Sequence, residues 1–220
     1  MPLVVNYNDM TLKHFCIFLI LSPIICFSQK TSEFPVKDSE SLISQIKNFS
    51  QKTNSIAADF TQIKEMSFME EKITSSGKFY FQKEQMMRWE YTSPFAYAII
   101  LSGDRIRIID EGKTRDFDAS SNRMFLDISN IMTGMVNGTL LSSNEFSVNW
   151  FESDTYYKAE LLPGSAMMKD YLSRIELKMN KNDFSVDELK MFEKSGDYTV
   201  VIFRNKKLNE KIPSEIFNLD

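Results

Sequence analysis

The pattern of hydrophobic and polar residues predicts one amphipathic helix near the start of the chain, followed mainly by strands. Apolar side chains recur at helical spacing at Leu42, Ile43, Ile46 and Phe49, and Asp38 or Ser39 can cap the first turn. After Asn54 the period changes to two, which is typical of a strand with one buried face. We therefore expect a helix from Asp38 and a strand from Ile56 toward Lys64.

The rest of the chain continues this alternation between turn residues, and no internal repeat or linker interrupts it. We expect about ten strands in a meander of hairpins. We expect connecting segments at residues 30–37, which contain Pro35, and at residues 110–118, which are polar and rich in turn residues. Residues 164–170 predict a short helix or turn. The expected strands cover residues 56–64, 71–82, 86–91, 95–101, 105–110, 145–152, 155–162, 171–179, 186–193 and 198–205.

A Met-rich apolar segment, residues 122–141, breaks the run of strands. Its apolar residues follow helix-like spacing, interrupted at Gly134 and Gly138, so we expect a broken helix or two short ones. The segment is either an ordinary covering layer for the sheet or a movable lid, since Met packs against exchangeable partners. The lid residues would be Met124, Phe125, Ile128, Ile131, Met132 and Met135.

The N-terminus has the features of a secretory signal peptide. Lys13 and His14 precede an apolar run that is short for a membrane span, and Ser28 offers a small residue for cleavage. We expect a signal peptide over residues 1–28, with Met10 as an alternative start, and a single domain over residues 29–220. The domain would be exported to a soluble location on the envelope side. A lipid anchor at Cys26 is the alternative, although Ile25 is not the small residue that such a signal requires.

Charge and composition exclude several classes of function. The net charge of −4, with interspersed Lys and Arg, argues against nucleic acid as a partner. Cys16, Cys26 and the single His14 all lie in the predicted leader, so the mature chain has no His or Cys for catalysis or for a zinc site. We expect neither a metal nor a cofactor, and an enzyme built on paired carboxylates is the third-ranked alternative.

The two strands that span Gly77 to Tyr91 carry unusually large apolar side chains on one face. A curved antiparallel sheet with this face inside, covered by the Met-rich segment, would enclose an apolar cavity. The natural guest of such a cavity is an acyl chain, because each methylene taken from water contributes about 0.8 kcal/mol. The same side chains would form an ordinary solid core if the sheet closed tightly.

Several segments in order resemble the LolA family of periplasmic carriers of outer-membrane lipoproteins. They are FTQ at 60–62, SSGKFYF at 75–81, MRWEYTSP at 87–94, GDRIRIID at 103–110 and FRNKKLNEKIPSEIF at 203–217. The resemblance implies a mainly β fold with helices, an incomplete, unclosed antiparallel β-barrel covered by lid helices over a hydrophobic cavity. It also implies a monomer that takes acylated lipoproteins from an inner-membrane lipoprotein-releasing transporter and delivers them to an outer-membrane acceptor.

The resemblance further implies roles for individual residues. Where the family has an Arg that latches the lid, six residues before the Trp, this chain has Lys83, a poorer multidentate donor. The expected acyl-binding residues are Phe60, Phe79, Phe81, Met87, Trp89, Tyr91, Ile99 and Ile106.

The alternative function is an envelope sensor of the same fold that binds lipids or mislocalised lipoproteins and signals to a protein partner.

Overall fold

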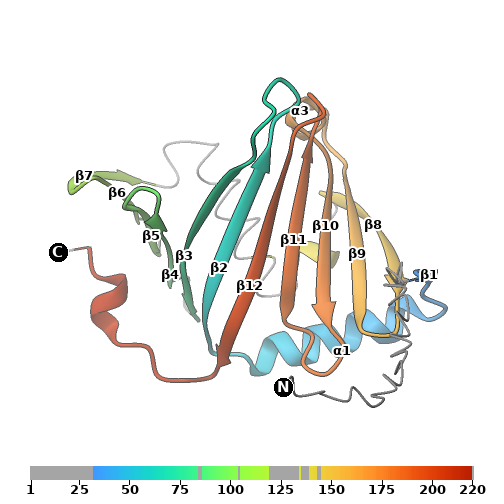
Figure 1. Ribbon diagram of the computed structural model, residues 1–220. Helices are drawn as coiled ribbons and strands as arrows, with labels where there is room; N and C mark the ends of the chain where they lie inside the picture. The colour runs from blue at the N-terminus through green and yellow to red at the C-terminus, as the bar shows by residue number, and fades with distance from the viewer. Residues whose placement is uncertain are drawn as a thin grey trace, which may run out of the picture. The chain divides into compact units, whose positions relative to one another are not determined.

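The computed structural model describes residues 32–83, 86–103, 105–118, 134, 139–142 and 145–219 (Figure 1). The chain divides after Lys30, and the described residues all belong to the second unit, Thr31–Asp220. The expected signal peptide, with Cys26, lies outside the described residues. The leader, the alternative anchor and the single domain over residues 29–220 therefore stay predictions.

The described fold is mainly β, with one antiparallel sheet of 12 strands in the order β1-β8-β9-β10-β11-β12-β2-β3-β4-β5-β6-β7. β1 and β7 are its two edges and do not pair with each other, so the sheet is not closed. The expected mainly β fold with an unclosed antiparallel sheet is thus confirmed. The strands are β1 (Phe34–Pro35), β2 (Ser55–Glu65), β3 (Ile73–Gln82), β4 (Met86–Ser93), β5 (Tyr97–Ser102), β6 (Arg105–Asp110), β7 (Lys113–Asp118), β8 (Phe146–Glu152), β9 (Tyr156–Pro163), β10 (Leu172–Asn180), β11 (Val186–Glu193) and β12 (Tyr198–Leu208).

The helical segments with described bounds are α1 (Ser39–Lys52), η2 (Thr139–Ser142), α3 (Ala166–Tyr171) and η3 (Ser214–Phe217). Asp38 caps α1 as expected, because its Oδ1 accepts the backbone N–H of Ser41 at 2.9 Å. α1 runs across one end of β9, β10 and β11 (Figure 1). Its buried side chains, Leu42 and Ile46, join the core cluster that the sheet contributes.

The inner face of the sheet carries the large apolar side chains of the first strands, as the alternation predicts. Phe79 of β3 lies opposite Trp89 of β4, which in turn lies opposite Ile99 of β5. Cross-strand neighbours on one face pack against each other, so these pairs form a continuous apolar surface across three strands. The core cluster extends this surface into β10, β11 and β12 through Leu177, Leu189 and Val201.

The outer face of β5 is also buried, which explains why its sequence is apolar without alternation. Ala98 and Ile100 are 4% and 1% exposed, and Ile100 lies opposite the outward-facing Arg88. The 3-10 helix η3 contacts β4 and β5, and Arg88 donates a hydrogen bond to the Ile216 carbonyl at 3.3 Å. The C-terminal segment therefore covers the back of these strands.

Two expectations about connections are wrong. Residues 113–118 form the edge strand β7, and their polarity reflects exposure, since five of the six side chains are exposed. Residues 34–35, in the expected loose segment, pair with β8 as the short strand β1. Within the Met-rich segment, Gly134 is buried and its backbone is helical. The six expected lid residues lie outside the described part of the chain. The expected lid stays a prediction.

Candidate functional site

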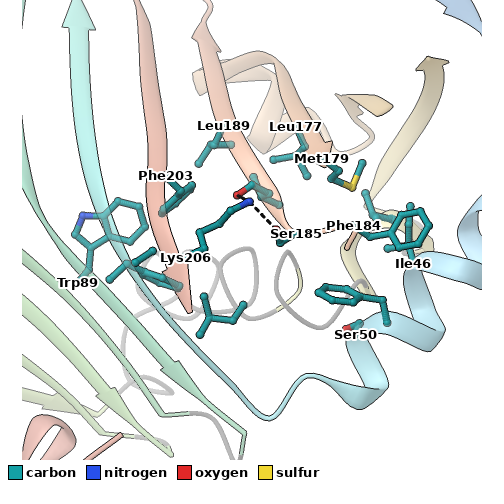
Figure 2. Close-up of a pocket in the computed structure, with 16 residues that line it drawn as sticks. Ile46, Ser50, Trp89, Leu177, Met179, Phe184, Ser185, Leu189, Phe203 and Lys206 are labelled. Atoms are coloured by element: carbon teal, nitrogen blue, oxygen red, sulfur yellow. Dashed lines mark hydrogen bonds between the residues drawn. The ribbon is translucent and has the colours of Figure 1, made fainter. Parts of the chain in front are cut away.

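An apolar cavity lies between α1 and the inner face of the sheet (Figure 2). The cavity volume is about 70 Å³, and the space without atoms, counted out into open solvent, is about 830 Å³. The cavity itself is therefore small, and a large guest must also occupy the part that is open to solvent. The lining consists of Ile46, Phe49, Ser50, Ile56, Ala58, Phe79, Trp89, Leu141, Leu177, Met179, Phe184, Ser185, Val186, Leu189, Phe203 and Lys206.

Three aromatic rings from three strands form one wall of this cavity. Phe79 of β3 lies 5.3 Å from Trp89 of β4 and 5.7 Å from Phe203 of β12, measured between ring centroids, and Trp89 lies 5.9 Å from Phe203. All three pairs meet edge to face, an arrangement that aromatic quadrupoles favour. Ala58, between them on β2, has a small side chain that leaves room in front of the rings.

Phe184, which lies in the turn between β10 and β11, lines the cavity at the end away from Trp89 (Figure 2). Its backbone is left-handed, with φ of 50°, a conformation that is uncommon for a bulky residue. The ring stacks on Tyr157 at 6.0 Å and lies 6.3 Å from Phe49 of α1. The turn thereby links the helix to the sheet at this end.

The indole N–H of Trp89 is buried and has no hydrogen-bond partner among the described residues. The hydroxyl of Tyr91, two residues along the same face, donates to Gln62 Oε1 at 2.9 Å. Burial raises the pKa of Tyr91, while Trp89 and Gln62 oppose this rise. The indole thus lies near the phenol without reaching hydrogen-bond geometry, and a donor stays unused in the cavity wall.

One charged side chain, Lys206, lies among the lining residues. Its ammonium donates to the hydroxyl of Ser185 at 2.6 Å and to the carbonyl of Val186 at 3.3 Å. It also pairs with the carboxylate of Asp187. Figure 2 shows the side chain reaching from β12 toward Ser185, with the hydrogen bond dashed.

The eight expected acyl-binding residues share the inner face but only two of them line the cavity. Phe79 and Trp89 are in the lining. The others lie in the core cluster or pack against it, beside the cavity. These six are Phe60, Phe81, Met87 and Ile106, which are buried, and Tyr91 and Ile99, which are partly buried. The role of all eight residues in acyl binding stays a prediction.

The expected latch residue, Lys83, lies at the end of α1. Its backbone N–H donates to the Asn54 carbonyl at 2.8 Å, and its ammonium donates to the Gln51 carbonyl in the last turn of the helix. A cation at this place satisfies a terminal carbonyl and complements the helix dipole. Lys83 therefore fixes the C-terminal end of α1, and its expected role as a latch stays a prediction.

The sequence interpretation missed the lining residues that β10, β11 and β12 supply. Leu177, Met179, Leu189 and Phe203 alternate as ordinary strand residues, so nothing in their spacing distinguishes a cavity wall from a core. The feature of the sequence that could have indicated these lining residues is the resemblance of residues 203–217 to the closing strand of the LolA family. That strand brings Phe203 and Lys206 to the cavity.

The described residues suit a binding site for apolar groups. Among them there is no cluster of His, Cys, Asp or Glu that could hold a metal ion. In the same part of the chain, no helix has both the length and the apolar character needed to cross a bilayer. The chemistry of the cavity comes from its aromatic and aliphatic walls and from the polar groups of Ser50, Trp89, Ser185 and Lys206.

Comparison with solved structures supports the fold. An uncharacterised conserved protein from Thermus thermophilus superposes with a TM-score of 0.50 at 9% identity, covering 83% of this chain and 95% of that one. A LolA superfamily protein from Nitrosomonas europaea gives 0.43 at 12% identity, covering 83% and 98%. At 9% identity, the likeness to the Thermus thermophilus protein concerns the fold alone.

Comparison of sequences identifies the family. The chain is 30% identical over 95 residues to the outer-membrane lipoprotein carrier protein of Methylococcus capsulatus, and this match spans 42% of each chain, less than half the relative's length. The model of the family described as outer membrane lipoprotein carrier protein LolA matches residues 51–220, which include every cavity-lining residue outside α1. Its description supports a carrier type of role that involves lipoproteins or lipids. The chain belongs to the LolA family of outer-membrane lipoprotein carrier proteins.

Proposed function

We propose that this protein binds the acyl chains of lipoproteins and carries them through the periplasm toward the outer membrane. The observation that carries the proposal is the cavity, in which all described lining residues except Ser50, Ser185 and Lys206 are apolar. Family membership supports the same role.

The physical basis of binding is burial of hydrocarbon. Each methylene that leaves water contributes about 0.8 kcal/mol, so a long acyl chain gains ample affinity without any directed polar contact. Aromatic walls such as those of Phe79, Trp89 and Phe203 present flat, non-directional surfaces, which suits chains of variable conformation. Transport of this kind requires binding and release, and it requires no reaction at the site.

The proposed route follows from the same function. The protein is exported by its leader, acts as a monomer, receives an acylated lipoprotein from an inner-membrane releasing transporter and passes it to an outer-membrane acceptor. Exposure of the acyl chains to water is unfavourable, so they occupy the cavity while the polypeptide of the cargo stays outside.

A charge in the aromatic wall tests this function. The substitution Phe79→Glu places a carboxylate where the side chain is 6% exposed and the surroundings are apolar, which opposes entry of hydrocarbon. We expect the variant to be secreted but to lose uptake of a fluorescent long-chain acyl probe. Near-UV circular dichroism establishes that it has kept its tertiary structure.

A matched control uses the neighbouring position on the same strand. Lys78 is exposed, and the alternation of β3 places its side chain on the outer face. Lys78→Glu introduces the same carboxylate one residue away and should leave probe uptake unchanged. Full uptake by a folded Phe79→Glu variant would show that Phe79 does not line the acyl site, and loss of uptake in both variants would point to net charge as the cause.

A further inference from the structure

Lys206 reaches the inner face of the sheet through a bulge in β12. Arg204 pairs with Asp59 and Lys207 pairs with Ala57, so β12 uses one residue more than β2 over this step. The extra residue is Asn205, which adopts a left-handed backbone with φ of 51°, and Asn tolerates this conformation better than most residues. Without the bulge, a one-residue shift would turn the side chain of Lys206 to the outer face.

The neighbouring strand is irregular at the same level. On β11, Glu188 pairs with Lys178 and Val186 pairs with Met179, which leaves Asp187 as an extra residue. The register between β11 and β12 extends only to Glu188 opposite Ile202. Beyond this point the Lys206 ammonium bridges the two strands, through its bonds to Ser185, to the Val186 carbonyl and to Asp187.

The two partners of this ion pair differ in their contact with water. The side chain of Lys206 is 15% exposed, whereas that of Asp187 is 42% exposed. A second carboxylate, Asp183, reaches the ammonium only indirectly, because its Oδ1 accepts the hydroxyl of Ser185 at 2.6 Å and the Ser185 N–H at 2.9 Å. Asp187 can therefore return to water at small cost, while Lys206 stays at the cavity.

We propose that Lys206 makes the cavity a site for free amphiphiles as well, with one alkyl chain that ends in an oxyanion, a carboxylate or a phosphate, and that Lys206 determines the specificity for this end. This inference rests on the proposed binding of acyl chains in the cavity and extends it to free lipids, because an acyl chain joined to a lipoprotein by an ester or amide bond has no oxyanion. The oxyanion takes the place of Asp187 on the ammonium, and the hydrocarbon lies along Phe203 and the other apolar walls. The exchange replaces one carboxylate by another anion, so the ammonium is never left without a counter-charge in the cavity.

The alkyl chain and the ammonium contribute differently to the free energy of binding. The alkyl chain supplies most of the affinity through burial, and the ammonium supplies the preference for a charged end. Hydrogen bonds to charged groups are stronger than neutral ones, so the preference over a neutral end of the same length is about tenfold or more.

The test compares hexadecanoate with hexadecanol, which differ at the end that would meet Lys206. Both are titrated against the mature protein below their aggregation limits, by displacement of a fluorescent alkyl reporter. We expect hexadecanoate to bind about tenfold more tightly than hexadecanol. Hexadecyl phosphate forms a third arm, and tighter binding of the phosphate or of the carboxylate identifies which head group the site prefers.

Three variants assign the preference to the bulged lysine. Lys206→Met keeps the side-chain length without the charge and should abolish the preference for hexadecanoate while hexadecanol binding stays the same. Asp187→Asn weakens the competing anion and should tighten hexadecanoate binding. Lys207→Met removes an identical charge from the neighbouring position, where the side chain is 60% exposed, and should change neither ligand.

The outcomes separate this inference from the proposed function. Equal affinity of the wild-type protein for hexadecanoate and hexadecanol overturns the role of Lys206 but leaves acyl binding in place. If Lys206→Met binds both ligands more weakly, the lysine acts only by holding β11 and β12 together, and its proposed role in specificity is overturned. If neither ligand binds the wild-type protein, the proposed function fails and the selectivity fails with it.

Discussion

Gly77 of β3 lies directly against the backbone of Glu90 in β4. A Cβ atom at residue 77 would stand 1.8 Å from the Glu90 carbonyl oxygen and 2.9 Å from Cζ of Phe60. The first of these contacts involves backbone within a hydrogen-bonded ladder, which cannot move without disturbing the register of the two strands. The glycine is therefore required by the close approach of β4 and by the ring that covers it.

Gly77→Ala should accordingly destabilise the domain by about 1–3 kcal/mol or more, the range of overpacked cores. The measurement is the midpoint of urea unfolding, followed by far-UV circular dichroism. Ser76→Ala, one residue earlier on the other face, is the control and should change the free energy of unfolding by less than about 0.5 kcal/mol. Equal stability of the two variants would contradict the close approach of β3 and β4.

The C-terminal segment stabilises the sheet from its outer side. Phe217 in η3 is 3% exposed, and η3 contacts β4 and β5. Phe217→Ala should lower the free energy of unfolding by about 3–5 kcal/mol, because it removes a buried ring and leaves a cavity behind. The exposed Glu215, in the same 3-10 helix, is the matched position: Glu215→Ala should have almost no effect in the same urea titration. A small loss in Phe217→Ala would mean that the segment does not cover the strands.

The turn between β11 and β12 is tied to the loop after β2 by Asp197. The backbone N–H of Ser67 donates to Asp197 Oδ1 at 2.8 Å, and this bond, followed by the Ser67 side chain, lowers the pKa of Asp197 below its ordinary value. A carboxylate with a lowered folded-state pKa stabilises the fold at neutral pH, and this contribution is lost as the pH falls through the folded-state pKa.

Asp197→Asn should therefore be less stable than the wild type at pH 7, and the difference should shrink as the pH falls below about 4. Urea unfolding at a series of pH values measures it. Asp154→Asn, in the exposed turn between β8 and β9, is the control and should follow the wild-type curve. A stability difference for Asp197→Asn that is constant over the acid range would exclude the proposed linkage.

Sequence patterning was sufficient to predict two of the three aromatic residues in one wall of the cavity. Alternation with period two places Phe79 and Trp89 on one face, and both line the cavity. The helix was equally predictable, because Asp38 and the spacing of Leu42 and Ile46 are local signals. These features depend on near neighbours in the chain, which is why the sequence alone reveals them.

The inward turn of Lys206 could not be predicted in this way. Strict alternation from Phe203 would place residue 206 on the outer face, and only the bulge at Asn205 reverses it. A bulge depends on how β12 pairs with β2, a strand more than a hundred residues earlier in the chain. The edge strand β7 was missed for a related reason, because its exposed polar residues are indistinguishable from those of a turn.

Transfer of a lipoprotein into solution tests the proposed carrier function most directly. The mature chain is mixed with the acylated and the de-acylated forms of one lipoprotein, and soluble complexes are separated by size-exclusion chromatography. We expect a stable one-to-one complex with the acylated form and none with the de-acylated form, because the acyl chains supply the affinity. Equal binding of both forms would contradict it.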